Sequence, residues 1–547
     1  MLKDELQKLI FNSVKNAYPK TKILLADIEL ENAKNTEFGD LASNIGFKLA
    51  KEQKLLPQEV ASKLAELIRT NWPKHLSQII YSSHQLGYIN FSYNYSFYVK
   101  QILEEGQCFG NLELLQNKKI QIEFISANPT GPLTLANGRG GFGGDVLANL
   151  YKKAGAQAER EYLVNDGGNQ VKILGDSVLI AAGLMSEKED SYRGEYIEAW
   201  VKENSETIKE FQGDSKQLGQ KVAKDILDSQ IKKSIEKMNI NFDNWFSEQS
   251  LIESGEVNKA LSDFEKKGRS YKKDGALWFK TTDFGDDKDR VLVKADGENT
   301  YFANDAAYHW DKFAVRGFDK VVNFWGADHH GYIGRMQAAT EAMGFKDQLE
   351  IVIMQLVRLI QNGKEVRMSK RKGTYITMDE LLDLIGGTEQ EASDVARFFF
   401  LSRSFNTHMD FDLDLAREHS EKNPVFYVKY AYARLSGILK NAEKMNLPQA
   451  NLELLQHEKE VDLIRELIKL PELIGAIIED KNYPVHLLTF YAQNLASKFH
   501  SFYDQCRVID EKDFELTAAR LKLVEATKIV LGITMKDLIG IDTPEKM

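Results

Sequence analysis

A strand–loop–helix–strand pattern is the feature that most constrains the fold of this chain. Residues Ile120–Ile125 form a β-rich run, and a loop with two prolines follows. A helix is expected from about Gly144 to Lys153, and Arg160–Val164 again has the composition of a strand. This βαβ order is typical of a parallel sheet covered by helices, so we predict an α/β domain of the Rossmann type.

The segments on either side of this pattern differ from it in character. Residues 1–110 combine helical apolar spacing with an aromatic, strand-like run at Tyr88–Tyr95, which predicts an N-terminal α+β domain. Residues 170–265 are charged and helix-forming, as a helical insertion would be. From about Ser393 onward, apolar residues at helical spacing predict an all-helical C-terminal domain. We therefore expect three domains, at 1–110, 111–385 and 386–547.

Charge and cysteine content exclude several classes of protein. The 547 residues include 71 Lys and Arg against 81 Asp and Glu, a formal net charge of −10. This acidity excludes a protein that coats nucleic acid with its whole surface, but it allows a local basic groove. Cys108 and Cys506 are the only cysteines, which excludes a disulfide framework and a cysteine-rich zinc module. Because the first residues are charged and no run of about 18 apolar residues occurs, we expect no membrane segment and a cytoplasmic location.

A glycine-dense stretch, Asn137–Gly144, contains the spacing G-x-G-x-x-G from Gly138 to Gly143. In a dinucleotide-binding fold these glycines directly follow the strand. Here residues 127–137 intervene, and the loop is too long for a dehydrogenase. Two interpretations stay open: the helix start offers N–H groups to a phosphate, or the glycines form a tight helix-packing surface.

The cationic run Lys364–Gly373 is a second candidate site. Five Lys and Arg residues and one Glu give it a net charge of +4 within an acidic chain. A loop of this kind, with glycine at its end, can clamp a polyphosphate, although many charged runs are only solvated surface.

Acidic and histidine residues form the third group of candidates. Tyr301 and Asp305 are one helical turn apart, and Glu123 lies on the strand that leads into the Pro/Gly loop. Carboxylates beside a phosphate site suit a cationic substrate group such as a planar guanidinium, and internal ion pairs are the alternative. His329 and His330 are adjacent and would point apart in an extended loop, so we expect polar contacts to substrate there and no metal site.

Three stretches together resemble the class I arginyl-tRNA synthetases: Ser126–Leu133, Gly326–Tyr332 and Met368–Arg371. Further landmarks of that family follow in the same order along almost the whole chain: Phe38–Asn44, Asp274–Phe279, Asp286–Leu292, Asn423–Tyr427, Tyr430–Arg434 and Pro544–Met547. The resemblance implies an N-terminal module that touches the elbow of the tRNA, a Rossmann-type catalytic domain with insertions, and a helical anticodon-binding domain.

The resemblance also implies the reaction. L-Arginine would react with ATP to give arginyl-adenylate, and the arginine would then pass to the 3′ end of tRNA(Arg), with release of AMP and pyrophosphate. ATP would bind with Mg²⁺ as a substrate, and no structural metal is expected. In such enzymes tRNA is needed even for the first step. The expected partners are tRNA(Arg), L-arginine and ATP, with the protein a monomer.

Roles for single residues follow from the same resemblance. The catalytic candidates are Lys370, which matches the lysine that stabilises the charge on pyrophosphate, with Ser369, Met368, Thr134 and Asn137. The candidates for ATP binding are Pro132, Gly138, Gly140, Gly141 and Asp328. The candidates for arginine binding are Glu123, Asn128, Tyr301, Asp305 and His329. The candidates for tRNA binding are Phe38, Asn44, Tyr430 and Arg434.

One signature departs from the family. Its His-x-Gly-His sequence, directly after Gly-Pro-Leu, is here Thr134-Leu-Ala-Asn137, so both histidines are absent. Thr134 and Asn137 keep hydrogen-bond donors but carry no charge. Two hypotheses follow: an active arginine–tRNA ligase that uses these neutral donors, and a non-catalytic relative that binds tRNA or arginine.

Overall fold

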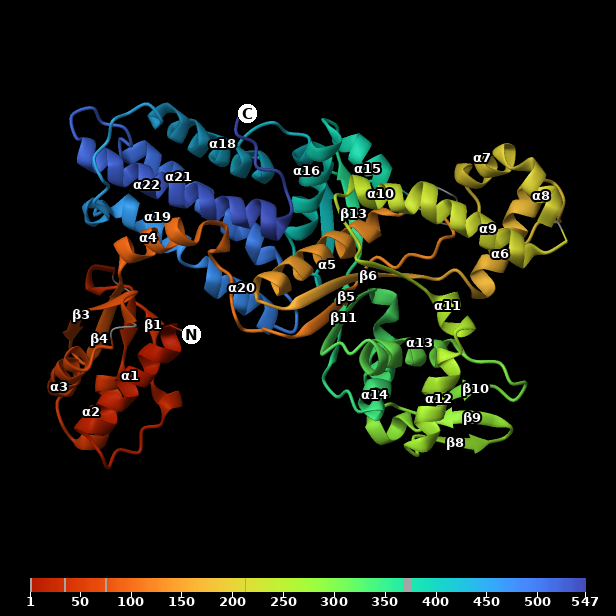
Figure 1. Cartoon of the computed structure of the whole chain (residues 1–547), viewed down its shortest axis with the longest axis horizontal. Helices are drawn as coiled ribbons and strands as arrows, with labels where there is room; N and C mark the ends of the chain where they lie inside the picture. Colours follow the sequence, from red (N-terminus) through yellow and green to blue (C-terminus); the bar gives the residue numbers. More distant parts are fainter. Residues whose placement is uncertain (1, 34–35, 74–75, 212, 367–375) are drawn as a thin grey trace. The chain divides into compact units, whose positions relative to one another are not determined.

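The chain forms two compact units in a computed structural model that describes residues 2–33, 36–73, 76–211, 213–366 and 376–547 (Figure 1). Unit 1 contains Met1–Phe109, Leu439–Ile468 and Ser501–Ile529, and unit 2 contains Gly110–Ile438, Lys469–His500 and Val530–Met547. Three long helices contribute residues to both units: α18 (Pro424–Ala442), α21 (His486–Gln505) and α22 (Phe514–Gly532).

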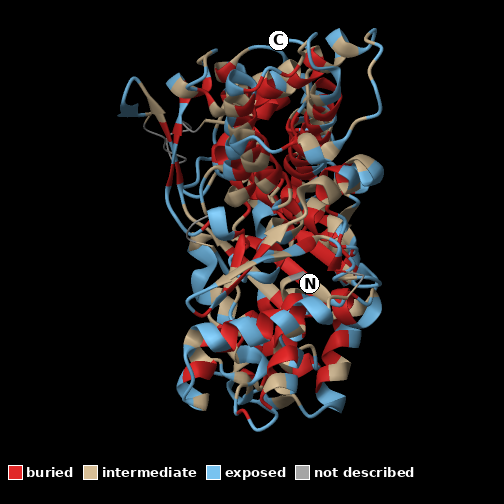
Figure 2. Ribbon diagram, turned by 90° about the vertical axis from the view of Figure 1, so that its left-hand side faces the viewer, coloured by how far each residue is buried: buried red, intermediate tan, exposed pale blue. Residues whose placement is uncertain are grey.

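The N-terminal part of unit 1 packs helices against a four-stranded antiparallel sheet of order β1-β2-β4-β3. Its elements are α1 (Leu2–Ala17), β1 (Glu31–Asn32), β2 (Leu41–Ser43), α2 (Ile45–Gln53), α3 (Pro57–Thr70), β3 (Ile79–Gln85) and β4 (Tyr88–Tyr93). Leu6, Ile10 and Val14 on α1 are buried at helical spacing, and they pack with Val60 and Leu64 of α3. Figure 2 shows this division on the ribbon, with buried residues along one side of a helix and exposed residues along the other.

Unit 1 also joins segments that are far apart in sequence. Helix α4 (Tyr95–Glu105) follows the N-terminal sheet and packs against α19 (Glu458–Leu467) and the short helix η10 (Leu452–Leu454). Segments from both ends of the chain therefore build this one unit.

Unit 2 is built on a five-stranded parallel sheet of order β12-β11-β5-β6-β7. Its strands are β5 (Lys119–Glu123), β6 (Gln157–Val164), β7 (Asn244–Ser247), β11 (Lys320–Gly326) and β12 (Leu349–Met354). Strand β5 comes first in sequence, and the later strands are added on both of its sides. In such a sheet, ligands bind beyond the carboxyl ends of the strands at the point where the order reverses. Here that point is the end of β5 and β11.

The segment between β6 and β7 is helical, as the sequence predicts for an insertion. Its helices are α6 (Gly168–Ala181), α7 (Glu195–Glu203), α8 (Ser205–Phe211), α9 (Ser215–Ile226) and α10 (Lys232–Lys237). The range predicted for it, 170–265, also includes β7, which is a strand of the main sheet, and helices α11 (Glu248–Glu253) and α12 (Glu256–Lys266). A strand of only four residues between helices gives too short a pattern to be recognised from sequence.

Two smaller sheets and further helices complete unit 2. One sheet has the order β10-β9-β8 and the other β14-β13-β15. The remaining elements named below are β8 (Ser270–Lys273), β9 (Ala276–Phe279), β10 (Arg290–Val293), α13 (Tyr301–Trp310), α14 (Ile333–Met343), β13 (Val357–Gln361), β14 (Lys364–Glu365), α15 (Met378–Ile385), α16 (Glu389–Leu401) and β15 (Met409–Asp412). Strand β15 lies in the region where the sequence predicts helix throughout. None of the helices in the described ranges is both long and apolar enough to cross a membrane.

Helix α5 (Leu135–Lys153) begins nine residues before the predicted start at Gly144, so the glycine-dense stretch lies inside it. Its glycines are buried, and each leaves room for a side chain of another element. A Cβ atom on Gly138 would meet Met378 Sδ at 2.7 Å, and one on Gly144 would meet the Phe124 ring at 2.3 Å. The helix-packing interpretation of the glycines therefore holds. Phosphate binding at this helix start stays a prediction.

Buried charges fasten α5 to the rest of unit 2. Asp145 on α5 accepts hydrogen bonds from Arg160 Nε of β6 at 2.8 Å and from Arg397 Nη1 of α16 at 2.5 Å. Arg397 also donates to the carbonyl oxygens of Met238, Asn239 and Ile539. One buried carboxylate thus links a strand, two helices and the C-terminal segment.

The glycine packing predicts how substitutions on α5 affect stability. Gly144→Ala should lower the free energy of unfolding by about 1–3 kcal/mol, because the added methyl group would overlap the Phe124 ring. The matched control is Gly437→Ala on α18, where a Cβ meets nothing within 4 Å. There the higher helix propensity of alanine should stabilise the protein by up to about 1 kcal/mol. Urea unfolding of both variants measures the difference, and equal effects would contradict the packing role.

Candidate functional site

The loop that leaves β5 turns sharply at the carboxyl edge of the parallel sheet. Ile125 and Ser126 have φ angles of 65° and 37°, a left-handed conformation that a β-branched residue such as isoleucine rarely adopts. Hydrogen bonds hold this turn: Ser126 Oγ donates to Glu123 at 3.2 Å, and the Leu163 N–H donates to Ser126 Oγ at 3.1 Å. Strain of this kind is typical of a functional site and directs the loop over the sheet edge.

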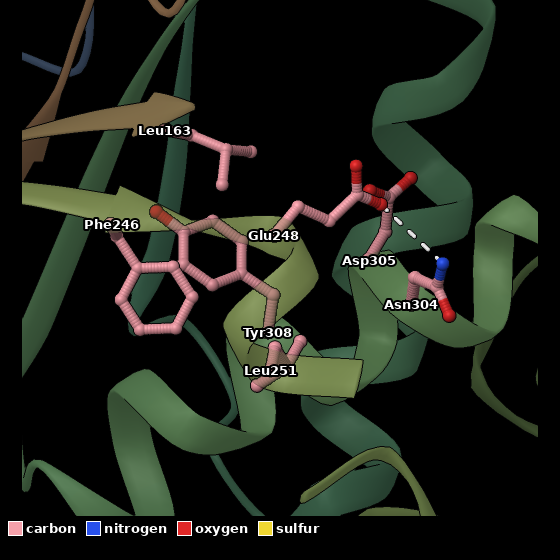
Figure 3. Close-up of a pocket in the computed structure, with 7 residues that line it drawn as sticks. All are labelled: Leu163, Phe246, Glu248, Leu251, Asn304, Asp305 and Tyr308. Carbon is pink, nitrogen blue, oxygen red and sulfur yellow. Dashed lines mark hydrogen bonds between the residues drawn. The ribbon is translucent and has the colours of Figure 1, made fainter. Parts of the chain in front are cut away.

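Two carboxylates meet in a small cavity beside this loop. Asp305 lies on α13 and Glu248 is the first residue of α11, directly after β7. Figure 3 shows both side chains among the residues that line the cavity, and Asn304 Nδ2 donates to Glu248 at 3.4 Å. The cavity volume of about 10 Å³ is close to the space of one water molecule. A larger cationic group would enter only after these side chains move.

The environment of the cavity disfavours two negative charges. Burial raises the pKa of Asp305 to about 7, and the neighbouring Glu248 and Glu123 add to the increase, while a hydrogen bond from Tyr332 opposes it. Burial also raises the pKa of Glu248. A bound cation would reverse this, since a nearby positive charge favours the ionised form of a carboxyl group.

Glu123 has a partner within the protein. Lys312 Nζ donates to Glu123 Oε2 at 2.5 Å, and the Lys312 side chain is fully buried, with the Tyr308 ring 4.1 Å from its ammonium group. This is the internal ion pair that the residue pattern left open as an alternative. Arginine binding by Glu123 stays a prediction. Asp305 and Glu248 instead accept hydrogen bonds from the neutral Tyr332 and Asn304 side chains.

A buried hydrogen-bond chain connects the ion pair to the cavity. Lys312 Nζ lies 3.5 Å from Asn323 Oδ1, Asn323 Nδ2 lies 2.9 Å from His309 Nε2, and His309 Nδ1 lies 2.8 Å from the Asp305 carbonyl oxygen. Burial lowers the pKa of His309 to about 3, with the positive charge of Lys312 acting in the same direction. A neutral His309 therefore accepts from Asn323 and donates to Asp305, which fixes α13 relative to β11.

The other predicted substrate residues are not among those that line this cavity. Tyr301 is at the start of α13 and two-thirds exposed. Asn128 accepts a hydrogen bond from Asn165 Nδ2 at 2.6 Å. His329 and Asp328 are exposed on η8 (Ala327–Tyr332), with 60% and 81% of their side chains accessible.

Sequence reasoning missed Glu248, which lines the cavity, and Tyr332, which contacts Asp305. Tyr332, at the end of η8, donates to Asp305 Oδ2 at 2.6 Å, and it lay in a recognised motif without a role. Glu248 belongs to no motif. Only its position in the sequence could have indicated a role. An acidic residue directly after a strand of a parallel sheet lies at the edge where ligands bind.

Most hydrogen-bond donors at the start of α5 already have an acceptor within the protein. The Thr134 N–H donates to Asn137 Oδ1 at 2.8 Å, the Leu135 N–H to the Ile376 carbonyl at 3.1 Å, and the Asn137 N–H to the Thr134 carbonyl at 2.9 Å. Thr134 Oγ1 also donates to Asn137 Oδ1, at 3.0 Å. Both bonds to Oδ1 orient the Asn137 amide and leave its NH₂ group as a donor. Pro132 lies in the preceding loop, and Met368, Ser369 and Lys370 lie outside the described residues.

Two of the four predicted tRNA residues lie in unit 1, and the other two lie on α18 in unit 2. In unit 1, Phe38 ends η2 (Thr36–Phe38) and is 36% exposed, and Asn44 precedes α2 and donates to Glu29 at 3.1 Å. In unit 2, Arg434 Nη2 donates to the Tyr430 hydroxyl at 2.7 Å on α18, and the Tyr430 ring stacks on His500. Within the described ranges, no three His, Cys, Asp or Glu side chains are grouped so that they could hold a metal ion.

Three family models match successive parts of the chain. Residues 4–93 match the arginyl tRNA synthetase N terminal domain, residues 98–395 the class I tRNA synthetase (R) catalytic domain, and residues 428–547 the DALR anticodon binding domain. The second match alone covers more than half of the chain.

Relatives of known name match over their full length. The arginine–tRNA ligase of Bacillus subtilis is 40% identical over 100% of this chain and 99% of its own, and that of Bacillus velezensis is 41% identical over the same shares. A solved structure of a putative arginyl-tRNA synthetase from Campylobacter jejuni is 31% identical, with a TM-score of 0.72, and covers 83% of this chain and 99% of its own. The Thermus thermophilus arginyl-tRNA synthetase shares the fold with a TM-score of 0.76 at 19% identity, and both chains are covered completely.

The Glu123–Lys312 pair predicts a large effect on stability. Lys312→Met should lower the free energy of unfolding by about 3–5 kcal/mol, because it leaves a buried carboxylate without its cation. The double variant Glu123→Gln/Lys312→Met should recover most of this loss, since neither charge then stays buried. The control is Lys320→Met, which removes the partly exposed pair with Glu350 and should cost less. Urea unfolding of the three variants decides, and a double variant no more stable than Lys312→Met would contradict the assignment.

Proposed function

The chain belongs to the class I arginyl-tRNA synthetases, and we propose which of its residues carry out the reaction of that family. The protein is an arginine–tRNA ligase: it activates L-arginine with ATP to arginyl-adenylate and transfers the arginine to tRNA(Arg), with release of AMP and pyrophosphate. The observation that carries the residue assignments is the cavity at the carboxyl edge of the parallel sheet, where Asp305 and Glu248 face the same space.

Asp305 and Glu248 bind the guanidinium group of arginine in this proposal. Guanidinium is planar and offers five N–H donors in a fixed fork, so two carboxylates can each accept charge-assisted hydrogen bonds from it. Glu123, with its charge balanced by Lys312, then contributes through its remaining acceptor capacity. Asn128, Tyr301 and His329 surround the rest of the substrate, as their positions in the family motifs predict.

Selectivity against lysine follows from the same geometry. The ammonium group of lysine is a compact charge that cannot reach two acceptors built for a planar fork. Each carboxylate oxygen left without a donor in a buried site lowers the affinity for the wrong substrate, so no editing domain is required.

Asn137 and Thr134 stand in for the absent histidines. Thr134 fixes the amide of Asn137 with two hydrogen bonds to Oδ1, which directs the neutral NH₂ donor away from the helix cap. We assign this donor to the ATP phosphates, together with Lys370, Ser369 and Met368 of the cationic run and with Pro132 and Asp328. Gly138, Gly140 and Gly141 act by letting α5 pack closely, so their part in ATP binding is indirect.

The remaining assignments extend the proposal beyond the active site. Phe38 and Asn44 contact the elbow of the tRNA, and Tyr430 and Arg434 contact it near the anticodon. ATP binds as its Mg²⁺ complex, and the enzyme works as a monomer. The two free cysteines favour the cytoplasm as its location.

A non-catalytic relative that binds tRNA or arginine is the second candidate, and the loss of both signature histidines is the observation that favours it. Charging of tRNA(Arg) with labelled arginine by the purified protein separates the two. Charged tRNA in the presence of Mg-ATP supports the ligase. Binding of arginine and tRNA without any charged product or adenylate would overturn it in favour of the binder.

The raised pKa of Asp305 predicts that arginine binding depends on pH. Guanidinium stays charged throughout, but a protonated Asp305 cannot accept two of its bonds, so the proton competes with arginine. With a pKa of about 7, KM for arginine should rise about tenfold as the pH falls from roughly 8 to roughly 6. Tyr332→Phe removes the hydrogen bond that lowers this pKa, so the rise should begin at higher pH.

Steady-state charging across this pH range measures the effect. Tyr271→Phe is the control, because the Tyr271 hydroxyl donates to Asp289, a residue that does not line the cavity. The proposal is contradicted if the Tyr332→Phe profile coincides with the parent profile.

The Asn137 assignment predicts a loss of rate that a helix-capping role would not give. Asn137→Asp keeps the cap acceptor for Thr134 and loses the NH₂ donor, whereas Asn137→Ala loses both. One preorganised donor contributes about 10²–10³ in kcat, and a neutral one toward the lower end, so both variants should form adenylate about 100-fold more slowly. Only Asn137→Ala should also be less stable, by about 1 kcal/mol.

Single-turnover formation of adenylate, with tRNA and arginine present, is the measurement for this pair. Normal adenylate formation by Asn137→Asp would show that the side chain serves only the helix.

A further inference from the structure

Asp40 is a buried charge in the N-terminal part of unit 1. It lies between η2 and β2, two residues after Phe38, and only 5% of its side chain is accessible. Its carboxylate accepts hydrogen bonds from the Tyr93 N–H at 2.8 Å and from the Tyr95 hydroxyl at 2.7 Å. The backbone of Asp40 is bonded as well, with its N–H donating to the Phe91 carbonyl at 2.7 Å. These hydrogen bonds fix the position of Asp40. They also fix the position of the neighbouring Phe38 segment.

The cation for this carboxylate comes from the other end of the chain. Arg465 Nε on α19 donates to Asp40 Oδ1 at 2.6 Å, and the two residues are 425 positions apart. The guanidinium also lies 5.6 Å from the centre of the Tyr95 ring, and its Nη1 lies 3.6 Å from Asp462 of the same helix. Next to this pair, Ser96 Oγ on α4 donates to Glu453 at 2.5 Å. Both contacts join the region matched by the N-terminal domain model, or the helix that follows it, to the region matched by the anticodon-binding model.

We propose that the Asp40–Arg465 ion pair positions Phe38 for tRNA by fastening the Phe38 segment to helix α19. The inference rests on the proposed contact between Phe38 and the tRNA elbow. It assigns Asp40, Tyr95 and Arg465 as positioning residues that act through Phe38, and none of them needs to touch the substrate. The N-terminal region and helix α19, both in unit 1, would then meet tRNA as one rigid surface, and the entropy of ordering them is lost during folding instead of during binding.

A matched ion pair on the same helix provides the control. Arg520 Nε on α22 donates to Glu460 Oε1 of α19 at 2.6 Å, with 13% of the Arg520 side chain and 1% of the Glu460 side chain accessible. This pair has similar burial and the same charge, and both residues belong to the anticodon-binding region. Arg520→Gln therefore disturbs α19 to a similar degree without releasing the Phe38 segment.

The experiment is a double-variant cycle on KM for tRNA(Arg) in the charging reaction of the full chain. Stacking of a base on an aromatic side chain is commonly worth about 5- to 100-fold in affinity, so Phe38→Ala should raise this KM about tenfold in the parent background. In the Arg465→Gln background the same substitution should raise it less than about twofold, since a released Phe38 no longer contributes. In the Arg520→Gln background the full effect of Phe38→Ala should persist. KM for arginine and ATP should be unchanged in every variant.

Each result bears on one of the two proposals. An equal effect of Phe38→Ala in the parent and Arg465→Gln backgrounds overturns the positioning role and leaves the Phe38 contact standing. A loss of the effect in both the Arg465→Gln and Arg520→Gln backgrounds also overturns it, because general loosening of α19 would then be the cause. No effect of Phe38→Ala in the parent overturns the Phe38 contact itself and the inference with it. If Arg465→Gln does not fold, Tyr95→Phe and Arg465→Lys weaken the same cluster and should reduce the Phe38 effect in proportion.

Discussion

The close packing of helix α5 depends on glycines, which have no side chain, in its first turns. Its buried glycines let Met378, Phe405 and Phe124 approach the helix backbone, so that it runs through the interior of unit 2 beside the parallel sheet. Asp145 on the same helix then binds Arg160 and Arg397 and fixes its rotation and depth. The first turn, with Thr134 and Asn137, is held in turn by the hydrogen bond from Leu135 to Ile376. A larger residue at the glycine positions would displace the start of the helix and, with it, every donor assigned to ATP.

The charges beside the sheet edge are arranged so that few of them stay unbalanced within the protein. Lys312 balances Glu123, and burial with mutual repulsion raises the pKa of Asp305 and of Glu248. The protein thereby avoids holding three unpaired carboxylates in a dry space, which would cost several kcal/mol for each. In the proposed function, guanidinium supplies the missing charge on binding. Arginine binding would then release a proton from Asp305, and the hydrogen bond from Tyr332 would set the pH at which this happens.

Sequence reasoning predicted the parts of this site that depend on local pattern. The βαβ order gave the parallel sheet, and the helical turn between Tyr301 and Asp305 placed the acid on α13. The predicted start of α5 was wrong because Asn and Gly have low helix propensity. In the folded protein, tertiary packing outweighs this low propensity. Glu248 was missed because a long helical segment separates β6 from β7, and no local feature connects them. Lys312 was missed as the partner of Glu123 for the same reason, since their contact spans 189 positions.

The division of the chain into units follows from pairs that no local pattern can reveal. Composition separates the sequence into successive segments, yet unit 1 combines the first 109 residues with two segments beyond residue 438. The entropy of closing a loop grows only with the logarithm of its length, so joining distant segments is little more costly than joining near ones. The partner of each buried group matters more than its distance along the chain. Without Arg465, which lies on α19, Asp40 would keep only neutral hydrogen-bond donors. Boundaries drawn from sequence therefore mark changes in residue pattern, while contacts such as the Asp40–Arg465 pair join segments that are distant in sequence.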